Sequence, residues 1–196
     1  MLINVITRTS NRPRAFARAR ESVLAQEFDG EVCHMVTTDD PNDKYVESDL
    51  ILKVQPENVE FPPNLYVNEA LALVETGWVV FLDDDNIFLR PDALQIIAEH
   101  ATDVYSLLLF KVKLLGRDIP TYNWCKPPVE GDIDTHCFAF HAKNRALARF
   151  SERYAGDFDS VSRLYEYLEP VWIDKVLAGS QRADGALGVG LREDVA

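Results

Sequence analysis

Short apolar runs alternate with amphipathic segments through the first half of the chain. The apolar runs have the length and composition of buried strands, and they cover residues 2–8, 31–38, 50–54, 78–82 and 104–112. Between them, helices are expected to begin at Pro13, at Asn64 as an N-cap, and at Pro91. This alternation predicts βα units arranged around a mostly parallel sheet.

The pattern is less regular after residue 112. HCFAFH (136–141) alternates like a strand, and helices are expected from about Asn144 and over 160–168. WIDKVLA (172–178) and ALGVGL (186–191) are each expected to supply a short strand. No segment has the composition of a linker, so we predict a single α/β domain over residues 1–196.

Composition narrows the possible partners. The chain has 196 residues, and its net charge of -12 argues against a broad nucleic-acid surface. A small anionic ligand remains compatible, through a metal ion or through the arginines near the N-terminus: Arg8, Arg12, Arg14, Arg18 and Arg20. Three cysteines, no apparent signal peptide and no apolar run of membrane-spanning length together predict a cytoplasmic location without a membrane span.

The stretch VVFLDDDN (79–86) places three adjacent carboxylates directly after a buried strand. Ligands of open α/β sheets bind at the carboxyl ends of the strands, where TRTSNRP, DDPND and DDDN all fall. In an extended segment Asp83 and Asp85 share one side while Asp84 points away. Converging carboxylates suit Mg²⁺ or Mn²⁺. The alternative is a solvated acidic turn. An EF-hand is excluded, because Phe88 and Leu94 occupy its glycine and glutamate positions.

Several segments together resemble the GT-A glycosyltransferases of the family 2 type. They are VITRTSNRP with the following ARARESVLAQ, then TTDDPND, then PNLYVNEALALVETGWVVFLDDDN. The resemblance is clear over residues 3 to about 100. It implies a single-domain, Rossmann-like α/β fold with a mostly parallel central sheet flanked by helices. It also implies a nucleotide-sugar-binding half at about 1–112 and an acceptor-binding half at about 113–196.

The resemblance also implies site residues. The donor nucleotide sugar is expected to contact Thr7, Arg8, Thr9, Arg12, Asp39, Asn68, Asp83 and Asp84. Within this set, Asp39 is expected to accept a hydrogen bond from uracil or guanine. Asp83 and Asp85 match the DxD motif, in which the last aspartate typically holds the metal ion. Asn68 has an alternative role as an ordinary surface residue of its helix.

The second half is expected to supply the acceptor site and the base. Asp134 and His141 lie in a segment that resembles the acceptor-pocket lining of these enzymes. His141 is our candidate for a further metal ligand, and the alternative is a strand-end histidine bonded to backbone. AGDFDSVSRL (155–164) resembles the motif that carries the general base. Asp157 is the favoured base and Asp159 the alternative, although Asp159 is also placed to be a helix N-cap.

The resemblance implies a metal-dependent glycosyltransferase. It would move a sugar from a UDP- or GDP-type donor to a carbohydrate or glycan acceptor with inversion, using Mn²⁺ or Mg²⁺. One alternative is a phosphatase of the haloacid dehalogenase type, with Asp83 as nucleophile and Asp85 as acid/base. Another is a GT-A-like module that binds a nucleotide or glycan without turnover.

Overall fold

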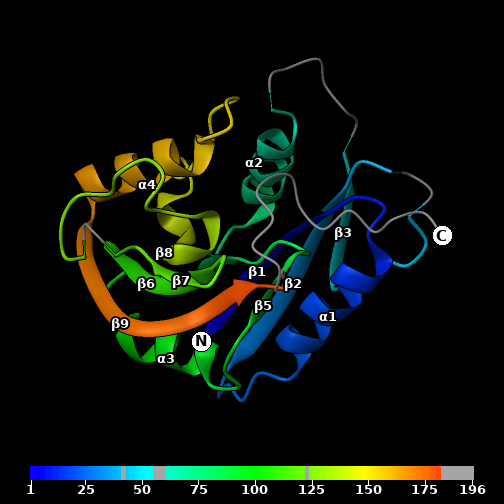
Figure 1. The fold of residues 1–196 in the computed structure, drawn as a ribbon, viewed down its shortest axis with the longest axis horizontal. Coiled ribbons are helices and arrows are strands. Elements are labelled where there is room, and N and C mark those ends of the chain that lie inside the picture. The colour runs from blue at the N-terminus through cyan, green and yellow to red at the C-terminus, as the bar shows by residue number, and fades with distance from the viewer. Residues whose placement is uncertain (41–42, 55–60, 122–123, 182–196) are drawn as a thin grey trace.

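The computed structural model of this chain describes residues 1–40, 43–54, 61–121 and 124–181. The strand expected at 186–191 lies outside these residues. Figure 1 shows a central sheet with helices on both of its sides. The strands are β1 (Leu2–Thr9), β2 (Glu31–Thr38), β3 (Leu50–Lys53), β4 (Trp78–Phe81), β5 (Asn86–Phe88), β6 (Ser106–Leu114), β7 (Arg117–Ile119), β8 (Phe138–His141) and β9 (Glu169–Ser180).

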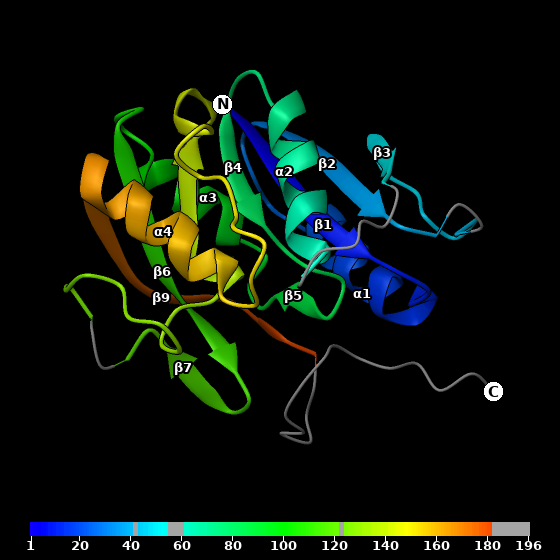
Figure 2. The same ribbon diagram turned by 90° about the horizontal axis from the view of Figure 1, so that it is seen from above.

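The strands form one mixed sheet in the order β3-β2-β1-β4-β8-β6-β9-β5, with β7 paired to β6. Figure 2 shows this order from β3 across β1 and β4 to β6 and β9. The long β1–β2 and β6–β9 ladders are parallel, as are β1–β4 and β2–β3. Antiparallel β8 is inserted between β4 and β6. The predicted α/β fold is confirmed, and its longest ladders are parallel. The alternating pattern did not predict the antiparallel β8, nor the antiparallel pairing of β5 with β9 and of β7 with β6.

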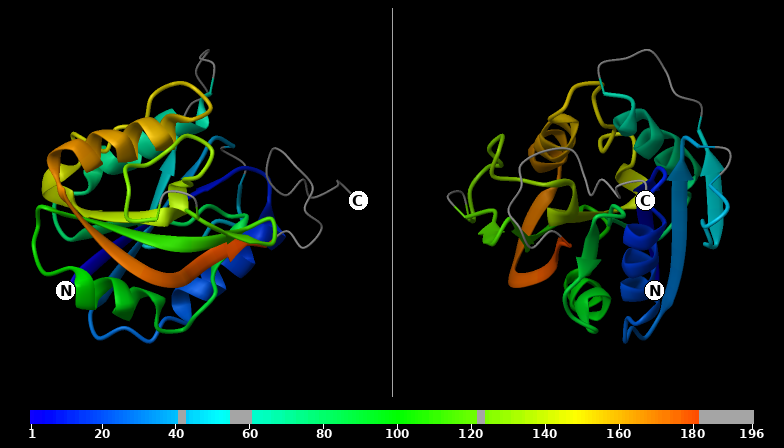
Figure 3. Two further views of the ribbon diagram at one scale, coloured as in Figure 1. Left: turned by 60° about the vertical axis from the view of Figure 1, so that its left-hand side comes forward. Right: turned by 45° about the vertical axis from the view of Figure 1, so that its right-hand side comes forward.

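Helices cover both faces of the sheet. They are α1 (Pro13–Leu24), α2 (Pro63–Leu73), α3 (Ala93–His100) and α4 (Gly156–Tyr167). Helices α2 and α4 lie on one face, and α1 and α3 lie on the other (Figure 3). As predicted, α1 begins at Pro13 and buries Phe16, Ala19 and Val23. Among the described residues, no helix is both long and apolar enough to cross a membrane.

Two local predictions are wrong. The α-helix expected from about Asn144 is replaced by a single 3₁₀ turn, η2 (Ala142–Asn144), whose buried Asn144 amide donates to the Val104 carbonyl at 2.6 Å. Asn64 does not cap α2, whose N-cap is Pro62 without a side-chain bond. The Asn64 amide is used in other contacts that are described below.

Helix α4 begins four residues earlier than the expected range of 160–168. This places Asp157 and Asp159 inside its first turn, where carboxylates are favourable beside the exposed amides. Asp159 is therefore not an N-cap. The earlier start also brings the beginning of α4 close to the 3₁₀ helix η1 (Thr135–Cys137), because Thr135 contacts Asp157.

An aromatic cluster fills the core behind the carboxyl end of β4. Phe81, the last residue of β4, packs its ring 5.5 Å from Phe138 and 5.3 Å from Phe150, measured between centroids. Both partners are buried. This packing fixes the position of the backbone that continues into Asp83, and so connects the core to the polar edge of the sheet.

Candidate active site

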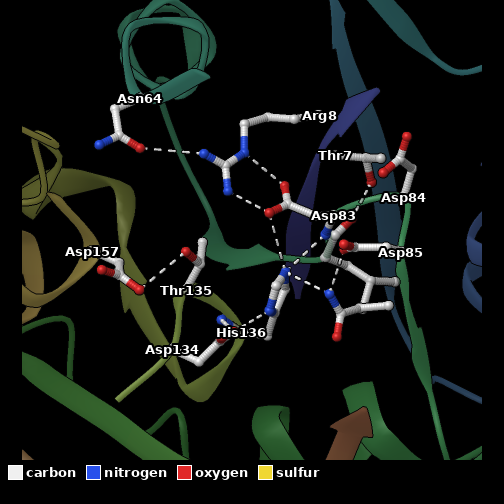
Figure 4. A network of polar contacts seen from close by, with 12 residues as sticks. Thr7, Arg8, Asn64, Asp83, Asp84, Asp85, Asp134, Thr135, His136 and Asp157 are labelled. Atoms are coloured by element: carbon white, nitrogen blue, oxygen red, sulfur yellow. Dashed lines mark hydrogen bonds and ion pairs between the residues drawn. The ribbon is translucent and has the colours of Figure 1, made fainter. Parts of the chain in front are cut away.

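The three adjacent carboxylates follow β4 and sit in a turn beside the end of β1 (Figure 4). Backbone pairing continues past β4, since Leu82 donates to Ile6 at 2.9 Å and Asp84 donates to Arg8 at 3.2 Å. The chain then turns, with the Asn86 N–H bonded to the Asp83 carbonyl at 3.0 Å. The segment is therefore not extended as expected, and its side chains divide between two arginines: Asp83 contacts Arg8, whereas Asp84 and Asp85 approach Arg12.

Arg8 binds Asp83 through two parallel contacts. Its Nε donates to Oδ1 at 2.8 Å, and its Nη2 donates to Oδ2. Burial alone would raise the pKa of Asp83, but the Arg8 charge and hydrogen bonds outweigh it and hold that pKa well below the usual range. Asp83 is therefore an ionised carboxylate whose charge is already compensated by a protein cation.

His136 joins this pair from η1 and was not predicted. Its Nδ1 donates to Asp134, and its Nε2 lies 3.0 Å from the Asp83 main-chain nitrogen and 3.4 Å from Asp83 Oδ2. A neutral ring would accept the Asp83 N–H, whereas a protonated ring donates to the carboxylate. Burial alone would lower the pKa of His136, but Asp134 and Asp83 outweigh it and raise the pKa to about 10. The two carboxylates thus favour a proton on Nε2, in competition with the Asp83 N–H that points at the same atom.

Asp157 lies near this network from the opposite side (Figure 4). Its Oδ1 accepts the Phe158 N–H at 2.8 Å, and Thr135 Oγ1 donates to its Oδ2 at 3.5 Å. Burial and the charge of Asp134 raise the pKa of Asp157 to about 6. Within the described part of the chain Asp157 has no ion pair, so its charge is less compensated than that of Asp83.

Asp84 and Asp85 face Arg12 instead. Arg12 Nε lies 3.0 Å from Asp84 Oδ2, and its Nη1 lies 3.8 Å from Asp85 Oδ2. Asp84 is completely buried, and burial raises its pKa to about 8. Burial and the neighbouring Asp83 charge also raise the pKa of Asp85, whose side chain is 21% exposed. Its Oδ1 accepts the Asn86 amide at 2.8 Å.

A divalent metal ion fits Asp85 better than Asp83. Asp85 is a partly exposed hard-oxygen donor whose ion pair with Arg12 is long, at 3.8 Å, whereas both Asp83 oxygens already contact Arg8. The described residues contain no group of three or more His, Cys, Asp or Glu side chains arranged to hold a metal. Mg²⁺ commonly binds through one or two carboxylates and takes its other ligands from water and phosphates. Such a site needs no closed protein cage.

Gln181 fixes the main chain of the carboxylate turn. Its N–H donates to the Asp85 carbonyl at 2.8 Å, and its Nε2 donates to the Asp84 carbonyl at 2.8 Å. The same amide reaches α1, because Nε2 donates to the Ala15 carbonyl at 3.1 Å and Oε1 accepts from Arg18. This residue, just after β9, was not predicted to be part of the site.

Three predicted donor contacts are corrected by burial, and the first is that of Asp84, whose side chain has no exposed surface. Thr7 has no exposed surface, and its Oγ1 donates to the Leu82 carbonyl at 2.6 Å and contacts His34 Nε2 at 2.9 Å. Thr9 is almost as buried and bonds Tyr45 at 3.0 Å. Both hydroxyls therefore support the neighbouring strand and loop and do not face a ligand.

Asn68 and Asp159 are corrected by their partners. The Asn68 side chain donates to the Phe150 carbonyl at 2.9 Å and accepts the Phe150 N–H at 2.8 Å, so its amide holds a loop. Asp159 is bound by Ser151 and by Arg153, whose Nε lies at 2.8 Å, and Arg153 lowers its pKa. An ion-paired carboxylate with a lowered pKa is a poor general base.

His141 lies at the wrong end of the sheet to complete a metal site with Asp85. It pairs with Trp78, the first residue of β4, whereas the carboxylates follow the last residue of that strand. Its Nδ1 accepts the Lys143 N–H at 3.2 Å, which is the alternative role of a strand-end histidine bonded to backbone. Asp39 lies just beyond β2, where the Tyr66 hydroxyl approaches its Oδ2 at 3.5 Å. That Asp39 accepts a hydrogen bond from the base of a nucleotide stays a prediction.

Neither protein-family models nor curated proteins match this sequence. Solved structures do match its fold. A structure of TarS residues 1–349 from S. aureus superposes with a TM-score of 0.70 at 21% identity, covering 92% of this chain and 60% of that one. The mannosyltransferase PcManGT from Pyrobaculum calidifontis, in complex with GDP-Man and Mn²⁺, gives 0.68 at 15% identity, covering 91% and 56%.

The fold is that of the GT-A glycosyltransferases. TarS 1–349 has also been solved with UDP and with UDP-GlcNAc, and these structures match at TM-scores of 0.65 and 0.63. The chain spans less than two thirds of the length of each of these proteins. In this chain, four charged side chains gather at one edge of the GT-A sheet, with Asp85 in the adjoining turn. They are Arg8, Asp83, Asp134 and Asp157.

Proposed function

We propose that this chain is a glycosyltransferase that moves a sugar from a UDP- or GDP-type donor to a hydroxyl of a carbohydrate or glycan acceptor, with inversion. The observation that carries the proposal is Asp157. It is a partly buried carboxylate with a pKa raised to about 6, placed across from the Arg8–Asp83 pair at the carboxyl edge of a GT-A sheet. The fold of the solved glycosyltransferases supports the same reaction class.

The donor side of the proposed reaction involves Asp85 and Arg12. Asp85 would hold Mn²⁺ or Mg²⁺, which would supply a Lewis acid for the anionic diphosphate of the donor. Arg12 adds a partly exposed guanidinium beside the same turn. Asp39, beyond β2, is proposed to accept a hydrogen bond from the base of the nucleotide. Arg8 acts through Asp83, whose charge it neutralises and whose position it holds.

The acceptor side depends on Asp157. In its ionised form Asp157 accepts the proton of the acceptor hydroxyl, and the oxygen forms a bond to the sugar carbon while the carbon–diphosphate bond breaks. Positioned general bases contribute about 10²–10⁴-fold to such reactions. Asp134 contributes twice, because its charge raises the pKa of Asp157 and its carboxylate accepts a hydrogen bond from His136 Nδ1, which orients that ring. A single displacement of this kind inverts the sugar carbon.

The arrangement at Asp83 disfavours a phosphatase mechanism. A nucleophilic Asp83 needs a free carboxylate oxygen, but both of its oxygens contact Arg8 and one also approaches His136. A module that binds donor without turnover is distinguished by experiment. The odd number of cysteines supports a reducing compartment, and we propose a cytoplasmic location on that basis.

The test combines binding and turnover. UDP, GDP, ADP and the corresponding sugar nucleotides are added with and without Mn²⁺, and thermal shift and donor consumption with oligosaccharide acceptors are measured. We expect a metal-dependent shift with UDP or GDP, together with turnover. Both are expected to disappear in Asp85→Ala and to persist in Asp92→Ala, which removes an exposed carboxylate of an Arg90 pair.

Each alternative has its own result. Full activity in EDTA, with Asp85 removed, contradicts the metal-dependent transferase. Metal-dependent nucleotide binding without turnover on any acceptor supports the binding module. Phosphate release from p-nitrophenyl phosphate without nucleotide binding supports the phosphatase.

A further inference from the structure

Asn64 is a buried residue in the first turn of α2, and it contacts two parts of the site (Figure 4). Its Oδ1 accepts a hydrogen bond from Arg8 Nη1 at 3.3 Å. Its Nδ2 donates to the Ser151 carbonyl at 2.8 Å and to the Arg153 carbonyl at 2.7 Å. Only 2% of its surface is exposed, so these protein contacts replace water entirely.

The two sides of Asn64 belong to different halves of the proposed reaction. Arg8 holds Asp83 in the carboxylate turn. Ser151 and Arg153 belong to the segment that leads into α4 and Asp157, and the Arg153 carbonyl also accepts the Gly156 N–H at 3.1 Å. Asn64 therefore connects the Arg8–Asp83 pair directly to the turn that starts the base-bearing helix.

Only a residue without a side chain fits at position 156 beside this contact. A Cβ at position 156 would lie 2.3 Å from Asn64 Nδ2 and 2.5 Å from the Ser151 carbonyl oxygen, which is closer than real Cβ atoms approach. The segment before Asp157 thus reaches the Asn64 amide because residue 156 has no side chain. The position immediately before the proposed base is fitted to the asparagine.

Asn68 provides a natural comparison one helical turn later. It also uses its amide to hold the backbone of the same segment, with bonds to both the N–H and the carbonyl of Phe150. Its described hydrogen bonds do not include Arg8. The two asparagines thus make the same kind of contact with the loop, but only Asn64 connects the loop to the carboxylate turn.

We propose that Asn64 is a positioning residue that couples the Arg8–Asp83 pair to the segment carrying Asp157, and so sets the spacing between the donor and base sides of the site. This inference rests on the proposed glycosyltransferase function. Asn64 acts through Arg8 and the 151–156 segment and not by touching a reactant. Small displacements of a reacting group lower rates by up to about 10²-fold.

The experiment compares Asn64→Ala with Asn68→Ala. Each variant leaves two backbone groups without their side-chain partner, so we expect similar losses of thermal stability. Only Asn64→Ala is expected to lower kcat, by about 10- to 100-fold, with the donor KM changed less than twofold. If Asn64→Ala does not fold, Asn64→Leu has nearly the same size and removes the amide contacts without adding a charge beside Arg8.

A second readout does not need turnover. Carboxyl ¹³C NMR titration of Asp157 is expected to give a pKa below that of the wild type in the Asn64 variant, because the base becomes more exposed to water. The charged groups around it, Asp134, Arg8 and His136, remain present. Asn68→Ala is expected to leave the titration unchanged.

The outcomes separate the two proposals. Equal kcat losses in both variants, or an unchanged Asp157 titration in the Asn64 variant, overturn the role of Asn64. A wild-type protein that shows no transfer contradicts the proposed function instead, while the NMR titration still decides whether Asn64 couples the two sides.

Discussion

Arg8, the second-last residue of β1, binds both carboxylate oxygens of Asp83, which lies 75 positions further along the chain. The side chains are each 15% exposed. One of the three adjacent carboxylates is thus neutralised by the protein itself. The remaining charge lies on the turn beside Arg12, where Asp85 is partly exposed.

Removing this arginine is expected to destabilise the fold. Arg8→Ala leaves the Asp83 charge largely buried without its cation, a change that typically costs about 3–5 kcal/mol. Urea unfolding at pH 7 measures the loss of unfolding free energy. Arg90→Ala is the control, because its ion pair with Asp92 is exposed and is expected to matter little. A comparably small loss in both variants contradicts this assignment.

The proposed base predicts a pH profile. Asp157 must be ionised to accept a proton, and its pKa is raised to about 6. We therefore expect kcat/KM to fall as the pH drops through about 6. Asp157→Asn is expected to lower kcat by about 10²–10⁴-fold while the donor Kd stays unchanged. The control is Asp159→Asn, at the ion-paired neighbour. Similar losses of kcat in both variants contradict the assignment of the base.

His136 is expected to make stability depend on pH. Its folded-state pKa is raised from 6.5 to about 10, so its contribution is fully present below about pH 6.5 and is lost as the pH rises toward 10. Buried Asp84, with its pKa raised to about 8, changes stability in the same direction. The informative measurement is thus the difference between the wild type and His136→Gln in urea unfolding from pH 6 to 10. If that difference is independent of pH, the prediction fails.

Thr7 distinguishes support of the fold from contact with the ligand. Thr7→Val removes the hydroxyl that bonds His34 and the Leu82 carbonyl, which typically costs about 1–3 kcal/mol. We expect lower thermal stability and an unchanged donor Kd, measured by calorimetry. Thr102→Val, at an exposed position, is the control for the substitution itself. If Thr7→Val instead binds the donor tenfold more weakly at unchanged stability, Thr7 contacts the nucleotide as the sequence predicted.

Replacing Gln181 tests whether its side chain holds the turn that carries Asp84 and Asp85. Gln181→Ala removes the amide that bonds the Asp84 and Ala15 carbonyls but keeps the main-chain N–H that bonds Asp85. Groups that orient metal ligands typically contribute 10- to 100-fold to metal affinity, and we expect about a tenfold weaker Mn²⁺ dependence of donor binding. Gln95→Ala, on α3, is the control. Equal Mn²⁺ titrations in the two variants contradict the supporting role.

The sequence predicted the parts of the site that depend on parallel strands. Arg8 lies near the end of β1 and Asp83 follows the neighbouring β4, and parallel pairing brings such positions to the same edge. His136 was missed because its contact with Asp83 depends on β8 entering antiparallel beside β4, and local periodicity contains no information about that pairing. The spacing of Asp134 and His136 was the available signal.

The wrong predictions share a physical cause. Thr7 and Asn68 were expected to face a ligand because of their positions, yet their polar groups are used by backbone and side chains distant in sequence. The carboxylates were expected to alternate because an extended segment was assumed, and a single bond from Asn86 to Asp83 turns the chain instead. Which polar groups remain free depends on tertiary contacts and not on the local pattern.

The contact between Gln181 and Ala15 spans 166 positions of the chain. Contacts of such long sequence separation have a large loop-closure entropy and tend to form late in folding. During synthesis, the first helix and the carboxylate turn leave the ribosome long before the residue that joins them. Cotranslational folding is therefore expected to assemble β1, β2 and β4 first and to complete the candidate site only after β9 has been made.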